Sequence, residues 1–121
     1  MYKYSFERLE VWTDARLLVR SVYSSTKEFP STEKFGLCTQ IQRAVVPVPS
    51  NIAEGMSQES NKEQLRFIEI AFGSLMEVYC QLYLSMDLDY ITKSQFDELK
   101  PEIDKISNKL NTLSRSIKKR V

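Results

Sequence analysis

The sequence predicts an all-α protein, an antiparallel up-down-up-down four-helix bundle, on three observations. Apolar residues return every three or four positions along four segments of the chain. The 121 residues include only 3 Gly and 4 Pro, too few for the tight turns of an all-β protein. Connections of roughly 3–5 residues separate the segments, and such short connections make consecutive helices antiparallel. We therefore expect residues 1–121 to form a single bundle domain.

The first helix is predicted over about residues 6–27. Its apolar face consists of Val11, Ala15, Leu18 and Val22. Phe29 precedes Pro30, and a residue before proline avoids the α region, so the helix should end before this pair.

The second helix is predicted to follow directly, with Ser31 or Thr32 as its N-cap. Its apolar positions are Cys38, Ile41, Val45, Val48 and Ile52. Pro47 and Pro49 lie within this run, and a proline in a helix interior costs ~3 kcal/mol or more. Because the apolar phase continues unshifted past both prolines, we predict a continuous helix that is kinked there. Gly55 is suited to the left-handed position that ends it.

The third helix has the strongest pattern and begins at a capping box formed by Ser60 and Glu63. Its main stripe is Leu65, Ile68, Phe72, Leu75, Tyr79, Leu82 and Met86. A second seam beside it holds Gly73, Met76, Cys80 and Tyr83. The helix therefore lies between two neighbours or faces another subunit, with Met76, Cys80 and Tyr83 as the candidate oligomer interface. Gly73 indicates a close approach of two helices or, alternatively, a ligand groove.

The fourth helix begins at a second possible capping box, Thr92 and Gln95. Its apolar stripe is Phe96, Leu99, Ile103, Ile106, Leu110, Leu113 and Ile117. Pro101 lies near its start and should either kink the helix or mark its true first turn.

The composition argues against an enzyme. The chain has no histidine, which removes Ser-His-Asp catalysis, Cys-His catalysis and His-ligated zinc. We expect no catalytic residues, no metal and no cofactor. Cys38 and Cys80 form no C-x-x-C pair and are expected to be buried, reduced thiols. No apolar run of 18 residues and no signal peptide is visible, so we expect a cytoplasmic protein without a membrane partner.

Local charge patterns are the candidates for binding, because 17 basic and 16 acidic residues leave a net charge of only +1. Arg16, Arg20 and Lys27 project within ~40° of each other on the first helix. From Lys105 onward the chain has six basic residues and no acidic one. Lys118, Lys119 and Arg120 crowd together at its end as candidate phosphate contacts. The alternative is that bases late in a helix complement its macrodipole.

A polar stripe on the second helix has two readings. It consists of Gln40, Arg43, Asn51 and Glu54. It is either a solvated face, or it is buried, with Arg43 paired to Glu77 of the third helix, since a buried arginine needs a partner.

Several segments together resemble a known family. They are residues 6–12 (FERLEVW), Phe29-Pro30 with Glu33, residues 40–44 (QIQRA), 51–55 (NIAEG) and 71–77 (AFGSLME), Leu88, and Tyr90-Ile91. The chain is similar to the four-helix bundle proteins encoded within intervening sequences of bacterial 23S ribosomal RNA genes, also labelled S23 ribosomal proteins. It is similar as well to accessory proteins of diversity-generating retroelements, which bind nucleic acid through a basic surface.

The resemblance implies a bundle that assembles as a homopentamer. It also implies a structural rather than catalytic signature, made of Arg43, Asn51, Glu54, Gly73, Ser74 and Glu77. Pro47 departs from the family, which more often has a small polar residue there, so the local helix geometry should differ.

The sequence therefore favours a non-enzymatic, homo-oligomeric bundle with a nucleic-acid partner, ribosomal RNA or its precursor. The alternative is a protein-interaction scaffold without a nucleic-acid partner.

Overall fold

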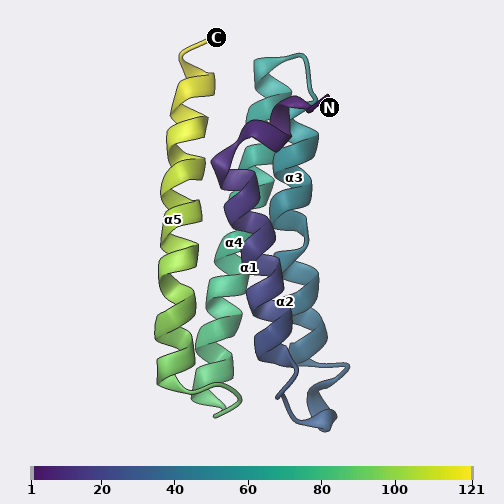
Figure 1. Cartoon of the computed structure of the whole chain (residues 1–121), viewed down its shortest axis with the longest axis vertical. Coiled ribbons are helices and arrows are strands. Elements are labelled where there is room, and N and C mark those ends of the chain that lie inside the picture. Colours follow the sequence, from purple (N-terminus) through teal and green to yellow (C-terminus); the bar gives the residue numbers. More distant parts are fainter. Residues whose placement is uncertain (1, 121) are drawn as a thin grey trace.

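The computed structural model describes residues 2–120, which form helices and no strand. The elements are η1 (Ser5–Arg8), α1 (Glu10–Thr26), η2 (Ser31–Glu33), α2 (Leu37–Val45), α3 (Pro47–Met56), α4 (Asn61–Asp87) and α5 (Lys93–Lys118). The helices α2 and α3 follow one another along a common direction, so the chain forms four rods (Figure 1). The predicted four-helix bundle is confirmed.

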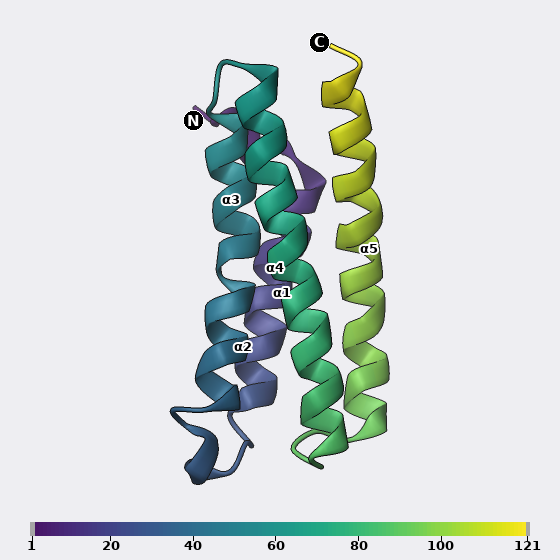
Figure 2. The same cartoon turned by 180° about the vertical axis from the view of Figure 1, so that it is seen from behind.

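The four rods are arranged so that each touches two others. Both α1 and α4 contact α2, α3 and α5, whereas α1 and α4 do not contact each other. Two opposite views agree with this arrangement, because α1 and α4 overlap in both and exchange front and back positions (Figures 1 and 2). The result is an antiparallel bundle in which α1 and α4 occupy diagonal corners.

The join between α2 and α3 is the kink predicted at Pro47 and Pro49. Val46 keeps helical angles, with φ −60° and ψ −41°, and Pro47 is the first residue of α3. A proline at the start of a helix is tolerated, because the N–H it lacks would have no partner there. The side chain of Asn51 donates to the carbonyl of Pro47 at 2.8 Å and braces this turn.

Two helix starts differ from the sequence-based expectation. Phe6 belongs to the short η1, and α1 begins only at Glu10. Ser31 and Thr32 lie in η2 rather than capping the second rod, which begins at Leu37. Its first free N–H groups find a partner further back, since the Leu37 amide donates to Glu33 Oε1 at 3.3 Å.

Within one chain, neither Gly55 nor Gly73 has the role predicted for it. Gly55 is a buried residue within α3, not a left-handed residue after it. A Cβ at Gly55 would lie 3.0 Å from the Cβ of Phe67, so this glycine lets α3 approach α4 closely. Gly73, the residue expected to allow such an approach, is exposed, and a Cβ there would meet nothing within 4 Å.

The core is one apolar cluster to which all four rods contribute. On α4 the buried apolar residues are Ile68, Ala71, Leu75, Val78 and Leu82. This line runs beside the predicted stripe, so Leu65, Phe72, Tyr79 and Met86 pack only at its margin. Ala71 and Ser85 are both buried in the core. Neither side chain is strongly apolar, so the apolar pattern of the sequence did not mark these two positions as buried.

On α5 the predicted stripe is buried, except that Leu113 is only partly covered. Because α5 begins at Lys93, Pro101 is an internal residue and does not mark the first turn. The expectation of two buried thiols is also wrong: Cys38 is half-buried and Cys80 is exposed.

Candidate nucleic-acid interface

The six candidate phosphate contacts are all exposed, but they do not form one patch. Arg16 and Lys27 are separated by ~16 Å along α1. Because α1 and α5 are antiparallel, Lys27 lies at one end of the bundle, while Lys118, Lys119 and Arg120 lie at the other (Figure 1). The two groups therefore face different ends of the bundle.

Arg20 is exposed but has acidic neighbours. It lines a groove of about 430 Å³ between α1 and α5 together with Glu28, Glu98 and Glu102. Ser21 donates to Glu102 Oε1 at 3.1 Å. Partial burial raises the pKa of Glu102, although this hydrogen bond and the charge of Lys105 oppose the increase. Three carboxylates around Arg20 make this groove unsuitable for a phosphate.

Arg16 is engaged by an aromatic ring. Its guanidinium carbon lies 4.7 Å from the centre of the Trp12 ring. The Trp12 ring packs edge-on against Phe6 at 4.9 Å, and Tyr4 and Tyr2 continue the series. We refer to Tyr2, Tyr4, Phe6 and Trp12 as the N-terminal aromatic row. Apolar periodicity does not predict this row, although aromatic residues at the alternate positions 2, 4 and 6 are a visible signal of it.

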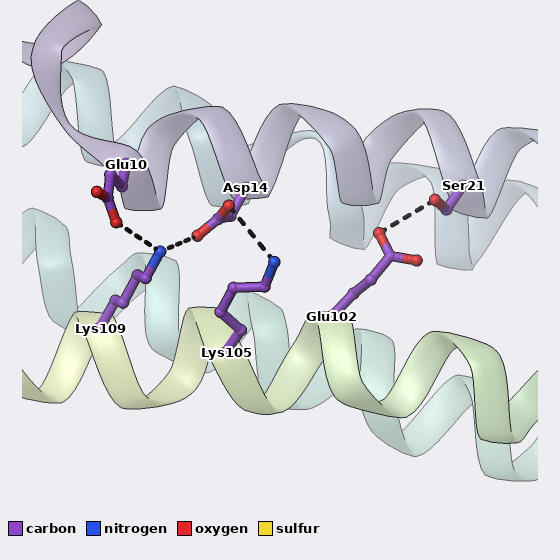
Figure 3. Close-up of polar contacts among 6 residues, drawn as sticks. All are labelled: Glu10, Asp14, Ser21, Glu102, Lys105 and Lys109. Atoms are coloured by element: carbon purple, nitrogen blue, oxygen red, sulfur yellow. Dashed lines mark hydrogen bonds and ion pairs between the residues drawn. The ribbon is translucent and has the colours of Figure 1, made fainter.

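A charge cluster joins α1 to α5 (Figure 3). Lys109 Nζ donates to Asp14 Oδ2 at 2.7 Å and to Glu10 Oε2 at 3.0 Å. Lys105 Nζ lies 3.9 Å from Asp14 Oδ1. The Asp14 side chain is 14% exposed, which makes it the least accessible member. The hydrogen bonds that Lys109 donates to Asp14 and, second, to Glu10 raise the pKa of Lys109.

This cluster divides the basic residues of α5 into two kinds. Lys105 and Lys109 are neutralised by acids of α1. The remaining four are Arg115, Lys118, Lys119 and Arg120, which we call the C-terminal basic cluster. All four are exposed and form no ion pair within residues 2–120. Acidic side chains of the described residues therefore leave these four cations without neutralisation.

The predicted burial of Arg43 against Glu77 is wrong. Both side chains are exposed, and the ion pairs among residues 2–120 do not include them. Arg43 lies on the outer side of α2, where it lines a shallow groove with Tyr23 and Val46. Glu77 accepts only from Gln81 of its own helix, at 3.4 Å. The polar stripe on the second rod is thus largely solvated. Its half-buried member, Asn51, donates a hydrogen bond to the Pro47 carbonyl in the first turn of α3.

The outer face of α4 leaves apolar side chains uncovered. We use this name for Ile70, Gly73, Met76, Cys80, Tyr83 and Leu84. Ile70, Tyr83 and Leu84 are 40%, 43% and 45% exposed, and Met76 is half-buried. The Tyr83 ring lies 4.7 Å from Phe96 of α5, so the face extends onto the α5 side. The candidate oligomer residues therefore sit where a neighbour could reach them.

The length and apolar character of α4 also meet the criteria of a membrane-spanning helix. It has 27 residues, and its most apolar window has a mean hydropathy of 1.2. The core helix of a bundle meets the same criteria, and α4 packs here against three other helices. Of that window, 33% is buried, as for a helix that packs one of its faces against a bundle.

No metal centre is visible in the part of the chain that the structure describes. Within it, His, Cys, Asp and Glu residues form no group of three or more that could hold an ion. The close carboxylates Glu10 and Asp14 instead share the Lys109 ammonium.

Comparisons with known proteins place this fold among relatives. The family model described as 23S rRNA-intervening sequence protein matches residues 7–112. A search of curated proteins found no match. The chain is similar to a solved structure from Bacteroides thetaiotaomicron, a protein with unknown function from the S23 ribosomal protein family. That likeness has a TM-score of 0.80 at 20% identity and covers 86% of this chain and 97% of the other.

Proposed function

Since this chain belongs to the 23S rRNA-intervening sequence protein family, we propose that it is a non-enzymatic, homo-oligomeric RNA-binding protein. Its ligand is ribosomal RNA or a ribosomal RNA precursor. The observation that carries the proposal is the C-terminal basic cluster. Its four exposed cations lie within six residues at one end of the bundle.

The mechanism is neutralisation of RNA phosphates with release of counterions. A net charge of +1 does not oppose this, because phosphate binding depends on local charge, and residues 115–120 hold four basic residues and no acidic one. Glu10 and Asp14 are both paired with Lys109, so their charges are offset within the chain (Figure 3). The Arg16 side chain adds a further cation on α1, whereas Arg20 lines a groove together with Glu98 and Glu102.

Assembly makes a small cluster effective. We infer a homopentamer held through the outer face of α4, with Met76, Cys80 and Tyr83 at the contact. Several copies of one weak site that engage a single RNA bind more tightly than one copy alone. Seven residues of α4 are buried within the bundle, so its exposed apolar side chains are assigned to neighbouring copies rather than to lipid.

The cytoplasm is the proposed compartment. Cys38 and Cys80 are both free, and exposed thiols such as Cys80 remain reduced there.

The test is RNA binding as a function of salt. We expect the triple variant K118E/K119E/R120E to bind a 23S rRNA fragment much more weakly than the wild type. The slope of log K against log salt should become shallower by ~2–3, close to one unit per lost contact. The variant K27E/K34E/K93E, which makes the same charge change at three exposed lysines at the opposite end of the bundle, is the matched control. No RNA binding by the wild type at ~50 mM salt, or a flat salt response, would exclude the proposal.

A protein-interaction scaffold is the second candidate, and the uncovered outer face of α4 favours it. A partner protein whose capture resists nuclease and is lost in a Tyr83→Glu variant would support this function over RNA binding.

A further inference from the structure

The N-terminal aromatic row has a geometry that packing of the bundle does not explain. Its rings follow one another with centroid separations of 5.0 Å for Tyr2–Tyr4, 6.5 Å for Tyr4–Phe6 and 4.9 Å for Phe6–Trp12. The rings of Tyr4 and Phe6 are nearly parallel, at 9°. Arg16 closes the series over the Trp12 ring at 4.7 Å. Four aromatic rings and a guanidinium therefore form one continuous surface.

The outer rings of this row are largely open to solvent. Tyr2 is 76% exposed and Tyr4 is 62% exposed, so neither contributes much to the core. Aromatic side chains stabilise a fold mainly by burying their large area, which these two do not do. Phe6 and Trp12 are half-buried and attach the row to the bundle. The row thus has a fixed base and an exposed outer part.

Charges around the row favour an anionic ligand. Lys3, Arg8 and Arg16 are exposed cations beside or within it. The neighbouring acids are occupied: Glu7 Oε1 accepts from the Tyr4 amide at 3.0 Å, and Glu10 accepts from Lys109. The row also lies at the same end of the bundle as the C-terminal basic cluster (Figure 1). Aromatic faces interleaved with arginines, next to free cations, are typical of surfaces that bind single-stranded nucleic acid.

We propose that the N-terminal aromatic row stacks the bases of single-stranded RNA, while Lys3, Arg8 and Arg16 contact the adjoining phosphates. This inference rests on the proposed RNA-binding function and specifies its substrate class. Every base has a π-face, so such a row accepts unpaired nucleotides of any sequence. Bases in an RNA duplex are stacked on each other and cannot reach these rings. The row should therefore select unpaired segments.

The chain supplies its own reporter, because Trp12 is its single tryptophan and belongs to the row. The experiment titrates the full chain with a 12-nucleotide oligouridine and, separately, with a 12-base-pair RNA duplex, following Trp12 fluorescence and anisotropy of labelled RNA. We expect oligouridine to quench Trp12 and the duplex not to do so. The variant Y2A/Y4A should bind oligouridine at least about tenfold more weakly, since one stacked base is worth that much. Phe6 and Trp12 remain, so the base of the row is preserved.

The matched control is Y23A/F35A, which removes two exposed aromatic rings elsewhere, 40% and 89% exposed. It should bind oligouridine as the wild type does. Equal affinity of Y2A/Y4A and wild type for oligouridine would overturn the inference and leave the proposed function intact. A changed sedimentation mass for Y2A/Y4A would overturn it too, because the row would then be a contact between copies. If the wild type binds neither RNA, the inference and the proposed function both fail.

Discussion

The seam between α1 and α5 and the outer face of α4 differ in whether their side chains find partners within one chain. Along the seam, Asp14 is 14% exposed and its carboxylate is matched by Lys109 and Lys105. On the outer face of α4, Tyr83 and Leu84 remain more than 40% exposed with no helix over them. The seam is complete within one copy, whereas the outer face of α4 is an exposed apolar patch, which is where we propose that another copy binds.

The largest expected effect is loss of assembly when the outer face of α4 becomes charged. In M76E/Y83E, two carboxylates would have to be desolvated at the contact, which a buried apolar interface does not tolerate. We expect the sedimentation mass to fall to that of a single chain, 14.1 kDa. The control S94E/N111E adds the same charges at exposed positions of α5 and should keep the assembly mass. An unchanged mass for M76E/Y83E would show that this face is solvated, and the contrast with the seam would disappear.

A second effect distinguishes Gly55, at the buried contact of α3 with α4, from Gly73 on the outer face of α4. In Gly55→Val, the Cβ must enter a space where Phe67 Cβ lies 3.0 Å away, and the branched methyls add to the clash. We expect the free energy of unfolding to fall by ~1–3 kcal/mol, as overpacking does. Urea unfolding monitored by circular dichroism measures it.

Gly73→Ala is the paired variant, because a Cβ there meets nothing within 4 Å. The free energy of unfolding of the single chain, measured in the M76E/Y83E background, should rise by about 1 kcal/mol from helix propensity alone. Destabilisation by Gly73→Ala in that background would contradict the open environment of Gly73.

The smallest expected effect concerns the seam. Asp14→Asn removes the carboxylate that Lys109 reaches at 2.7 Å, so the urea midpoint should fall. Glu10→Gln should lower it less, because the Glu10 side chain is 84% exposed. Equal effects of the two variants would contradict the seam geometry.

The same seam predicts a pH dependence with a definite sign. The pKa of Lys109 is raised above its usual 10.5 by Asp14 and Glu10. A raised pKa in the folded state stabilises the protein below pH 10.5, and this stabilisation is lost as the pH rises through the folded-state pKa. The difference between wild type and Asp14→Asn should therefore shrink at alkaline pH, which urea midpoints between pH 8 and pH 11 would measure.

Apolar periodicity predicted the rods because burial depends on a side chain's angle around its own helix. The unshifted apolar spacing of Val45, Val48 and Ile52 correctly predicted that the second rod continues beyond Pro47. Helix starts were less predictable, since Leu37 takes its N-terminal partner from Glu33, outside the usual capping positions. The spacing of apolar residues shows that a segment is helical, but it does not define the residue at which the first turn begins.

The candidate site was predicted only in part, because its properties depend on neighbouring helices. Exposure of Arg20 followed from its angle on α1, but the acids that face it come from α5, 78 and 82 residues later in the chain, at Glu98 and Glu102. The pairing of Arg43 with Glu77 failed for the same reason, since their helical angles did not establish that the two faces meet. RNA binding and the pentamer stay predictions.

An even number of antiparallel rods brings residues 2 and 120 to the same end of the bundle (Figure 1). A purification tag or fluorescent protein fused at either terminus would therefore crowd both the aromatic row and the C-terminal basic cluster. A circular permutant avoids this obstruction: a linker would join the present termini, and the new ones would open in the connection around residues 29–36, at the opposite end. Tethering through that connection would present the aromatic and basic end freely to RNA on a sensor surface.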